Sequence, residues 1–132
     1  MSKFRFVGYQ EQVEIPEGFE KLELNAEVFC GKNDPYIFVI QPLEISKWFY
    51  PITSLDARPS GKITFLDTSI EGICSAAELG KSITLISPQF GELSAMVKEK
   101  YLQLSYRILT DDLAAKKSVF ESQINSLKEL VK

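Results

Sequence analysis

The chain has 132 residues, with 15 Lys or Arg against 18 Asp or Glu, and it contains no histidine. Its length suits one domain, and 45% hydrophobic with 25% charged residues is typical of a globular protein. A net charge of −3 argues against a nucleic-acid partner bound by phosphate neutralisation. The lack of histidine excludes Ser-His-Asp and Cys-His catalysis and histidine-ligated metals.

The N-terminal region carries no secretion signal that we recognise, because Lys3 and Arg5 are not followed by an apolar segment. No apolar run approaches the roughly 18 residues that span a bilayer, so we predict a cytoplasmic protein without a membrane span. The two cysteines, Cys30 and Cys74, match no CxxC motif. We expect buried free thiols, with no metal site and no cofactor.

Residues 1–132 are predicted to form one domain. Residues 3–7 and 10–15 alternate apolar and polar side chains, and a Pro-Glu-Gly turn follows at 16–18. Residues 1–20 are therefore expected to be either an edge hairpin or an N-terminal extension. A regular alternation over residues 21–30 then predicts a half-buried strand.

Two short helices are predicted after this first strand. Asp34-Pro35 is typical of a helix start, and Pro42 forces a break near Gln41. The second helix is expected over residues 42–49. Turn residues then separate short alternating segments, which predict an antiparallel meander with strands at 53–58, 62–67, 70–78, 82–87, 92–99 and 101–109. Gly72 suggests a bulge or a close backbone approach.

A long amphipathic helix is predicted to end the chain. Thr110 is the candidate N-cap, and Asp111 and Asp112 would place negative charge in the first turn. Apolar residues recur at three- and four-residue steps, at Leu113, Phe120, Ile124, Leu127 and Val131. The fold class is therefore α+β, with a curved antiparallel sheet that wraps around the C-terminal helix.

Three segments resemble known sequence patterns. They are residues 45–51 with a Trp-Phe pair, residues 58–65 with a glycine turn before an aromatic strand, and residues 120–130 in the terminal helix. In this order they resemble the START-like and Bet v 1-like (SRPBCC) superfamily, and within it the Hsp90-ATPase-activator-homologue-like group. The resemblance covers residues 21–132, with Phe120 where many relatives have Trp. It implies the helix-grip fold and a cavity between sheet and helix.

Large apolar side chains are the candidate lining of that cavity, with the alternative that they only fill the core. Tyr106 is the most suggestive, because a buried phenol needs a hydrogen-bond partner that a ligand could supply. Arg107 alternates with it and is expected to face solvent. The candidate ligand-binding residues are Trp48, Phe49, Phe65, Leu85, Tyr106 and Phe120.

No catalytic constellation is visible in the sequence. A helix cap explains Asp111 and Asp112, and the glycines form no phosphate-binding loop. The leading hypothesis is therefore a non-enzymatic START-like domain that binds a small hydrophobic molecule. Alternatives are a protein-interaction or co-chaperone-like module with an apolar patch at Phe4, Phe6 and Tyr9, a cyclase- or aromatase-like enzyme, and a homodimer joined through sheet edges.

Overall fold

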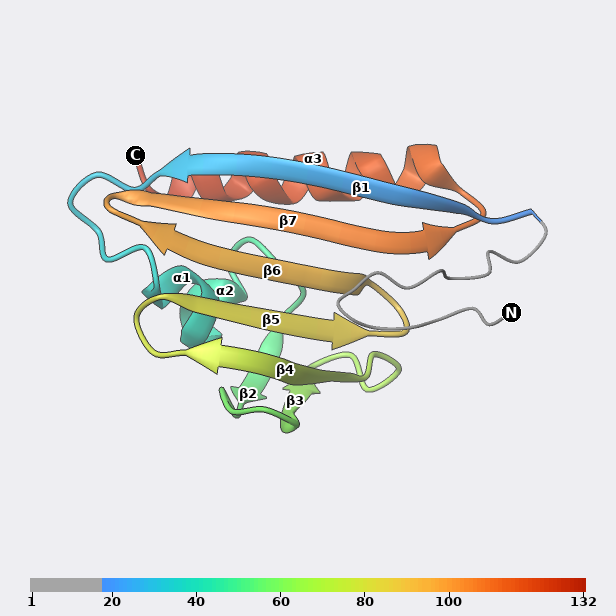
Figure 1. Cartoon of the computed structure of the whole chain (residues 1–132), viewed down its shortest axis with the longest axis horizontal. Coiled ribbons are helices and arrows are strands. Elements are labelled where there is room, and N and C mark those ends of the chain that lie inside the picture. Colours follow the sequence, from blue (N-terminus) through green and yellow to red (C-terminus); the bar gives the residue numbers. More distant parts are fainter. Residues whose placement is uncertain (1–17) are drawn as a thin grey trace, which may run out of the picture.

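The computed structural model describes residues 18–132, which form a seven-stranded sheet and three helices (Figure 1). The strand-like patterns at 3–7 and 10–15 and the predicted patch at Phe4, Phe6 and Tyr9 lie outside the described residues. The helices are α1 (Ile37–Ile40), α2 (Pro42–Ile45) and α3 (Leu113–Leu130). The strands are β1 (Glu20–Phe29), β2 (Ile52–Leu55), β3 (Gly61–Phe65), β4 (Gly72–Glu78), β5 (Ser82–Ser87), β6 (Gly91–Lys98) and β7 (Tyr101–Thr110).

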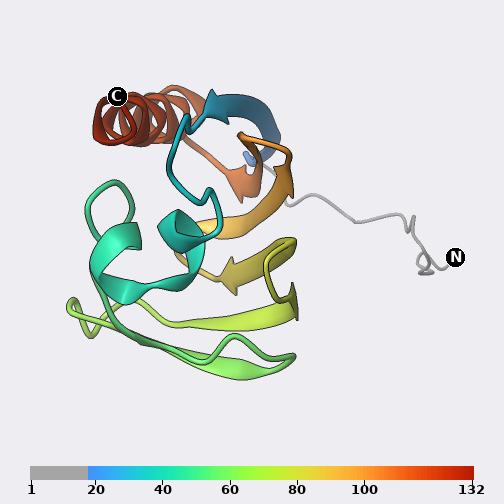
Figure 2. The ribbon, with the colours of Figure 1, turned by 90° about the vertical axis from the view of Figure 1, so that its left-hand side faces the viewer.

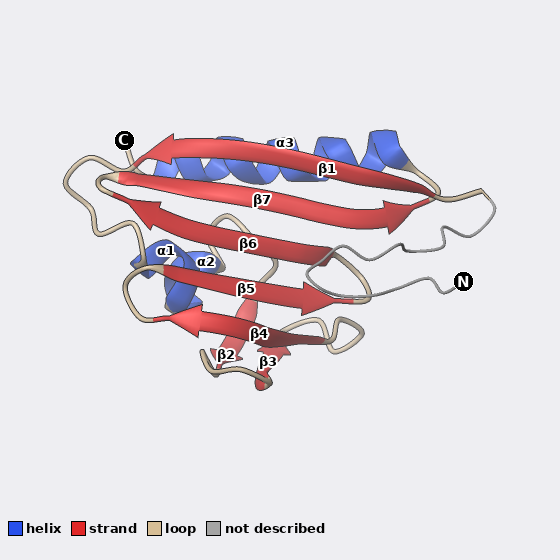
Figure 3. Ribbon diagram, viewed as in Figure 1, coloured by secondary structure: helices blue, strands red, loops and turns tan. Residues whose placement is uncertain are grey.

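The sheet is the predicted antiparallel meander, to which the first strand, β1, is added by pairing with the last one, β7. Its strand order is β1-β7-β6-β5-β4-β3-β2, so β2 to β7 follow one another and β1 joins the last of them (Figure 3). The β1–β7 ladder runs from Glu20 opposite Thr110 to Phe29 opposite Tyr101. Strands β1 and β2 are the two edges of the sheet.

The sheet curves strongly, and the three helices lie on its concave side (Figure 2). Helix α3 packs on β1 and β7, and α2 packs on β2 at the other end of the sheet. Along β7, Leu102, Leu104 and Tyr106 are buried, whereas Tyr101 is exposed and Gln103 is partly so. The predicted helix-grip architecture is confirmed, because one face of each strand is apolar and the helices cover that face.

The two short helices are present, but their bounds differ from the prediction. The Asp34 side chain accepts a hydrogen bond from the Tyr36 N–H at 3.1 Å, so it caps a turn and α1 begins only at Ile37. Pro42 does start α2, which ends at Ile45. Beyond α2, the Phe49 N–H still donates to the Ile45 carbonyl at 2.9 Å, and this turn carries the Trp-Phe pair into the core.

The predicted N-cap of the last helix is wrong by two residues. Thr110 is the final residue of β7 and is buried, and its hydroxyl accepts from the Asp112 N–H at 3.0 Å. Asp112 is the N-cap, since its carboxylate accepts from the Ala115 N–H at 3.1 Å. Pairing with Glu20 on β1 keeps Thr110 extended, so the helix starts later than its local sequence indicates.

Two further local predictions are confirmed. A Cβ on Gly72 would lie 3.1 Å from the Phe65 ring and 3.2 Å from the Ile86 carbonyl oxygen, which is a close approach. Cys30 and Cys74 are both buried free thiols, and burial raises the pKa of each.

Candidate functional site

All six predicted cavity residues lie on the concave side of the sheet and are between 1% and 6% exposed. They come from five parts of the fold: the turn after α2, the end of β3, the middle of β5, β7, and α3. The structure brings most of them into two groups of aromatic rings. The first group lies beneath α3 and the second lies beside α1 and α2.

The first group is a stacked pair that joins the sheet to the long helix. The rings of Tyr106 on β7 and Phe120 on α3 are 5.0 Å apart and only 12° from parallel. Ile124 and Leu127, one and two turns further along α3, are buried as well. The apolar stripe of α3 therefore meets the sheet in the way the periodicity predicts.

The second group is centred on Phe90, which is fully buried. Its ring centre lies 5.0 Å from that of Phe49, 5.6 Å from that of Tyr50 and 5.9 Å from that of Phe65. Trp48 adds a further contact with Phe49 at 5.5 Å. These edge-to-face and stacked arrangements are the favourable geometries for aromatic pairs.

Sequence reasoning missed Phe90 and Tyr50 as members of this interior. Phe90 lies in a predicted turn, and Tyr50 stands immediately before Pro51. The available signal was the residue type, because a phenylalanine side chain is more often buried than exposed. Neither position belongs to an alternating or helical pattern, so periodicity could not indicate their burial.

The buried polar side chains near α1 have hydrogen-bond partners, whereas those beneath α3 differ in this respect. Near α1, the Trp48 indole N–H donates to the Phe38 carbonyl at 2.7 Å, and the Tyr36 hydroxyl donates to the Ser82 carbonyl at 3.1 Å. Beneath α3, the hydroxyl of Tyr106 makes no hydrogen bond with any residue of 18–132, although the side chain is only 2% exposed. The partly buried Tyr50 hydroxyl has no partner among those residues either.

The phenols of Tyr106 and Tyr50 both have raised pKa values. Burial raises the pKa of Tyr106 to about 12, and the nearby Tyr50 phenol adds to the shift. Burial likewise raises the pKa of Tyr50. Both hydroxyls therefore stay protonated at neutral pH and remain able to donate a hydrogen bond.

Charged groups stay out of this interior. The buried side chains of residues 18–132 include no Asp, Glu, Lys or Arg, and the buried polar residues are Ser87 and Thr110. Arg107 lies on the opposite face of the sheet, 2.9 Å from Glu92 and 3.8 Å from Glu23. Within the same range, His, Cys, Asp and Glu side chains form no group of three that could hold a metal.

None of the helices in residues 18–132 is long and apolar enough to cross a bilayer.

Comparison with known proteins gives a match in structure and none in sequence. No protein-family profile and no curated protein matches the sequence. CalU16 from Micromonospora echinospora superposes with a TM-score of 0.62 at 12% identity, over 97% of this chain and 80% of its own. An Aha1 dimer from Colwellia psychrerythraea gives 0.62 at 13% identity, over 85% of this chain and 96% of its own.

A third similar structure is DynU16, a protein of the dynemicin biosynthetic locus, with a TM-score of 0.59 at 12% identity. The match covers 86% of this chain but 47% of the DynU16 chain, so this chain spans about half of its length. The chain has the helix-grip fold. This is the fold that the resemblance in the sequence implied, and the structural likenesses confirm it.

Proposed function

We propose that the protein holds a small, mostly apolar molecule between the sheet and α3, with the Tyr106 hydroxyl bonded to a polar atom of that molecule. The observation that carries the proposal is the Tyr106 phenol, 2% exposed and without a hydrogen-bond partner in residues 18–132. A buried hydroxyl without a partner costs free energy. A ligand that supplies an acceptor removes this cost on binding.

The surroundings of Tyr106 define the kind of ligand. The Phe120 ring stacks on the phenol, and Tyr50 is the nearby second donor. With no charged side chain buried in the described part of the chain, a neutral molecule with one carbonyl or hydroxyl group fits best. Trp48, Phe49, Phe65 and Leu85 would form the rest of the apolar wall.

The same chemistry favours a binding protein over an enzyme. A phenol whose pKa lies near 12 gives up its proton too reluctantly to act as a base at neutral pH. A cyclase- or aromatase-like mechanism would need a further acid or base in this interior.

The experiment is a binding screen of fatty alcohols, sterols and flat aromatic ketones by native mass spectrometry and ligand-detected NMR. Tyr106→Phe removes only the hydroxyl and should weaken the binding of the best ligand by about tenfold, the usual range for one hydrogen bond in a dry site. Tyr36→Phe is the matched control, because its hydroxyl already donates to Ser82 and its loss should leave the affinity unchanged.

Two results would refute the proposal. One is the absence of binding by every compound class in the screen. The other is a bound ligand whose affinity is the same in the wild type and in Tyr106→Phe.

We propose as a second function that the chain assembles with a copy of itself through a sheet edge. The Aha1 structure, which shares the fold, is a dimer, and β1 and β2 are the edges of this sheet. Unpaired strand edges are templates for pairing with another chain. Light scattering decides the question, since a monomer mass at all concentrations would exclude it.

A further inference from the structure

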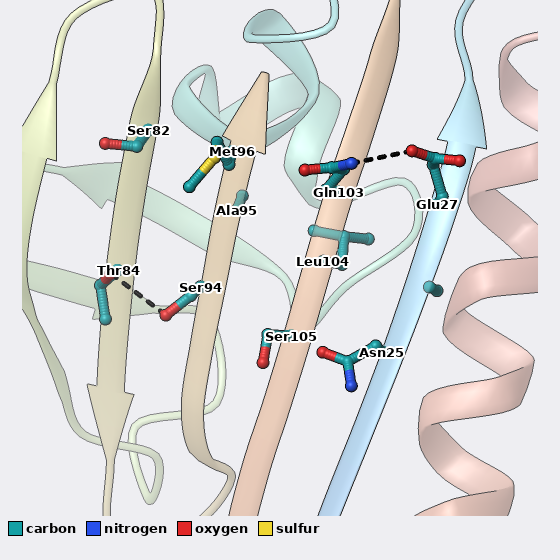
Figure 4. Close-up of a pocket in the computed structure, with 11 residues that line it drawn as sticks. Asn25, Glu27, Ser82, Thr84, Ser94, Ala95, Met96, Gln103, Leu104 and Ser105 are labelled. Carbon is teal, nitrogen blue, oxygen red and sulfur yellow. Dashed lines mark hydrogen bonds between the residues drawn. The ribbon is translucent and has the colours of Figure 1, made fainter. Parts of the chain in front are cut away.

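The face of the sheet that points away from α3 carries a groove of about 660 Å³. It crosses the four strands β1, β7, β6 and β5, as the close-up shows with α3 behind the sheet (Figure 4). Most of its lining consists of uncharged polar side chains. The groove lies on the other side of the sheet from Tyr106 and is independent of the proposed ligand site.

Two rows of side chains across the strands form the floor. In the first row, the register places Asn25 opposite Ser105, Ser105 opposite Ser94, and Ser94 opposite Thr84. These side chains are short, so the sheet surface is hollowed along this row. In the second row the same pairing aligns, from β1 to β5, Glu27, Gln103, Met96 and Ser82.

Some polar side chains in these two rows have no hydrogen-bond partner within residues 18–132. The Gln103 amide donates to the Glu27 carboxylate at 2.8 Å, and the hydroxyls of Thr84 and Ser94 are 3.2 Å apart (Figure 4). The side chains of Asn25, Ser82 and Ser105 make no hydrogen bond within residues 18–132. Hydroxyl and amide groups both donate and accept, so the floor can match a partner that does the same.

An exposed aromatic pair borders the second row. Phe29 and Tyr101 lie two residues beyond Glu27 and Gln103 and therefore on the same face of the sheet. Their rings are 5.1 Å apart, and the two residues are 57% and 38% exposed. Exposed aromatic faces attract polarised C–H groups, because the face of the ring carries negative charge density.

We propose that this groove binds a neutral oligosaccharide. A sugar ring presents hydroxyls at its rim and C–H groups on its faces, which complements hydroxyl and amide rows ending in an aromatic pair. Glu27 is the charged residue of the lining, and its negative charge disfavours nucleic acid, whose bases also stack on aromatic side chains.

The test is a titration of isotope-labelled protein with maltotetraose, cellotetraose and xylotetraose, each up to about 10 mM, followed by amide chemical shifts. At least one sugar should shift the amides of residues 25–29, 94–96 and 101–105 in a saturable way. Tyr101→Ala should weaken that binding by about tenfold, and Gln103→Leu by several-fold. Leu79→Ala, at an 86% exposed position outside the groove, should leave it unchanged.

Three outcomes would overturn the proposal. The first is that none of the three sugars gives saturable shifts in the groove. The second is binding that survives both Tyr101→Ala and Gln103→Leu. The third is that an octathymidine oligonucleotide shifts the groove amides at lower concentration than any sugar, which would assign the surface to nucleic acid.

Discussion

The concave side of the sheet contains two regions that differ in the hydrogen bonding of their buried polar side chains. At the α1 end, the Tyr36 hydroxyl and the Trp48 indole both donate to backbone carbonyls. Beneath α3, the Tyr106 hydroxyl is just as deeply buried and has no partner in the described chain. The first region is closed by its own hydrogen bonds. The second keeps a donor available, and this difference is the basis of the proposed ligand site.

The strongest perturbation should come from the ring at the centre of the aromatic group. Phe90→Ala removes contacts with Phe49, Tyr50 and Phe65, and should lower the free energy of unfolding by about 4 kcal/mol. Urea unfolding measures this change. A loss below about 1 kcal/mol would mean that the interior tolerates a cavity there, and would contradict close packing around Phe90.

The turn that delivers Phe90 into the core should be the next most sensitive position. Gly91 has φ +83, and a Cβ there would lie 2.2 Å from the Arg107 carbonyl oxygen. Gly91→Ala should cost about 3 kcal/mol, from the left-handed conformation together with the clash. Gly80→Ala is the control, because Gly80 has φ +79 and open space around its Cβ position, and it should cost about 1 kcal/mol. Equal losses would contradict the close approach.

Alkaline pH should reveal the burial of Tyr106. Folding raises its pKa from 10.0 to about 12, so the folded state holds the proton more tightly than the unfolded state. The resulting stabilisation is complete below pH 10, and about 2–3 kcal/mol of it is lost as the pH rises through 12. Subtracting the unfolding free energies of Tyr106→Phe from those of the wild type isolates this loss. A difference that stays constant from pH 9 to 12 would show that the phenol is solvated.

The smallest effect concerns the hydroxyl that already has a partner. Tyr36→Phe leaves the Ser82 carbonyl without its donor and should lower the free energy of unfolding by about 1–2 kcal/mol. Tyr106→Phe, which removes a hydroxyl without a protein partner, should leave the free energy unchanged or raise it. Thermal unfolding of both variants under one condition makes the comparison, and equal destabilisation would remove the distinction between the two regions.

Much of the fold could be predicted because strand alternation and helix periodicity depend on local sequence. The bounds of β5 (Ser82–Ser87) agree with the prediction to the residue. The end of β7 could not be predicted, since Thr110 stays extended only through its pairing with Glu20, far away in the chain. Likewise, α2 stops at Ile45 because the residues that follow bury Trp48 and Phe49.

The candidate site was predictable in composition but incomplete in geometry. The residues Tyr106 and Phe120 follow from apolar patterns on β7 and α3, and the structure stacks their rings. The proximity of Tyr50 to Tyr106 depends on how the turn after α2 packs against the meander. No spacing in the sequence encodes that proximity. The groove on the outer face has the same origin, because it arises from register between four strands.

The most direct test of the proposed function is an experimental structure of the protein with its best-bound apolar ligand. We expect a polar ligand atom at about 2.7 Å from the Tyr106 Oη atom, the usual O–H···O distance, with the ligand between α3 and the sheet, beside the stacked Tyr106 and Phe120 rings. A ligand bound elsewhere would contradict the proposed function. So would a protein group that accepts the hydrogen bond of the Tyr106 hydroxyl in the complex.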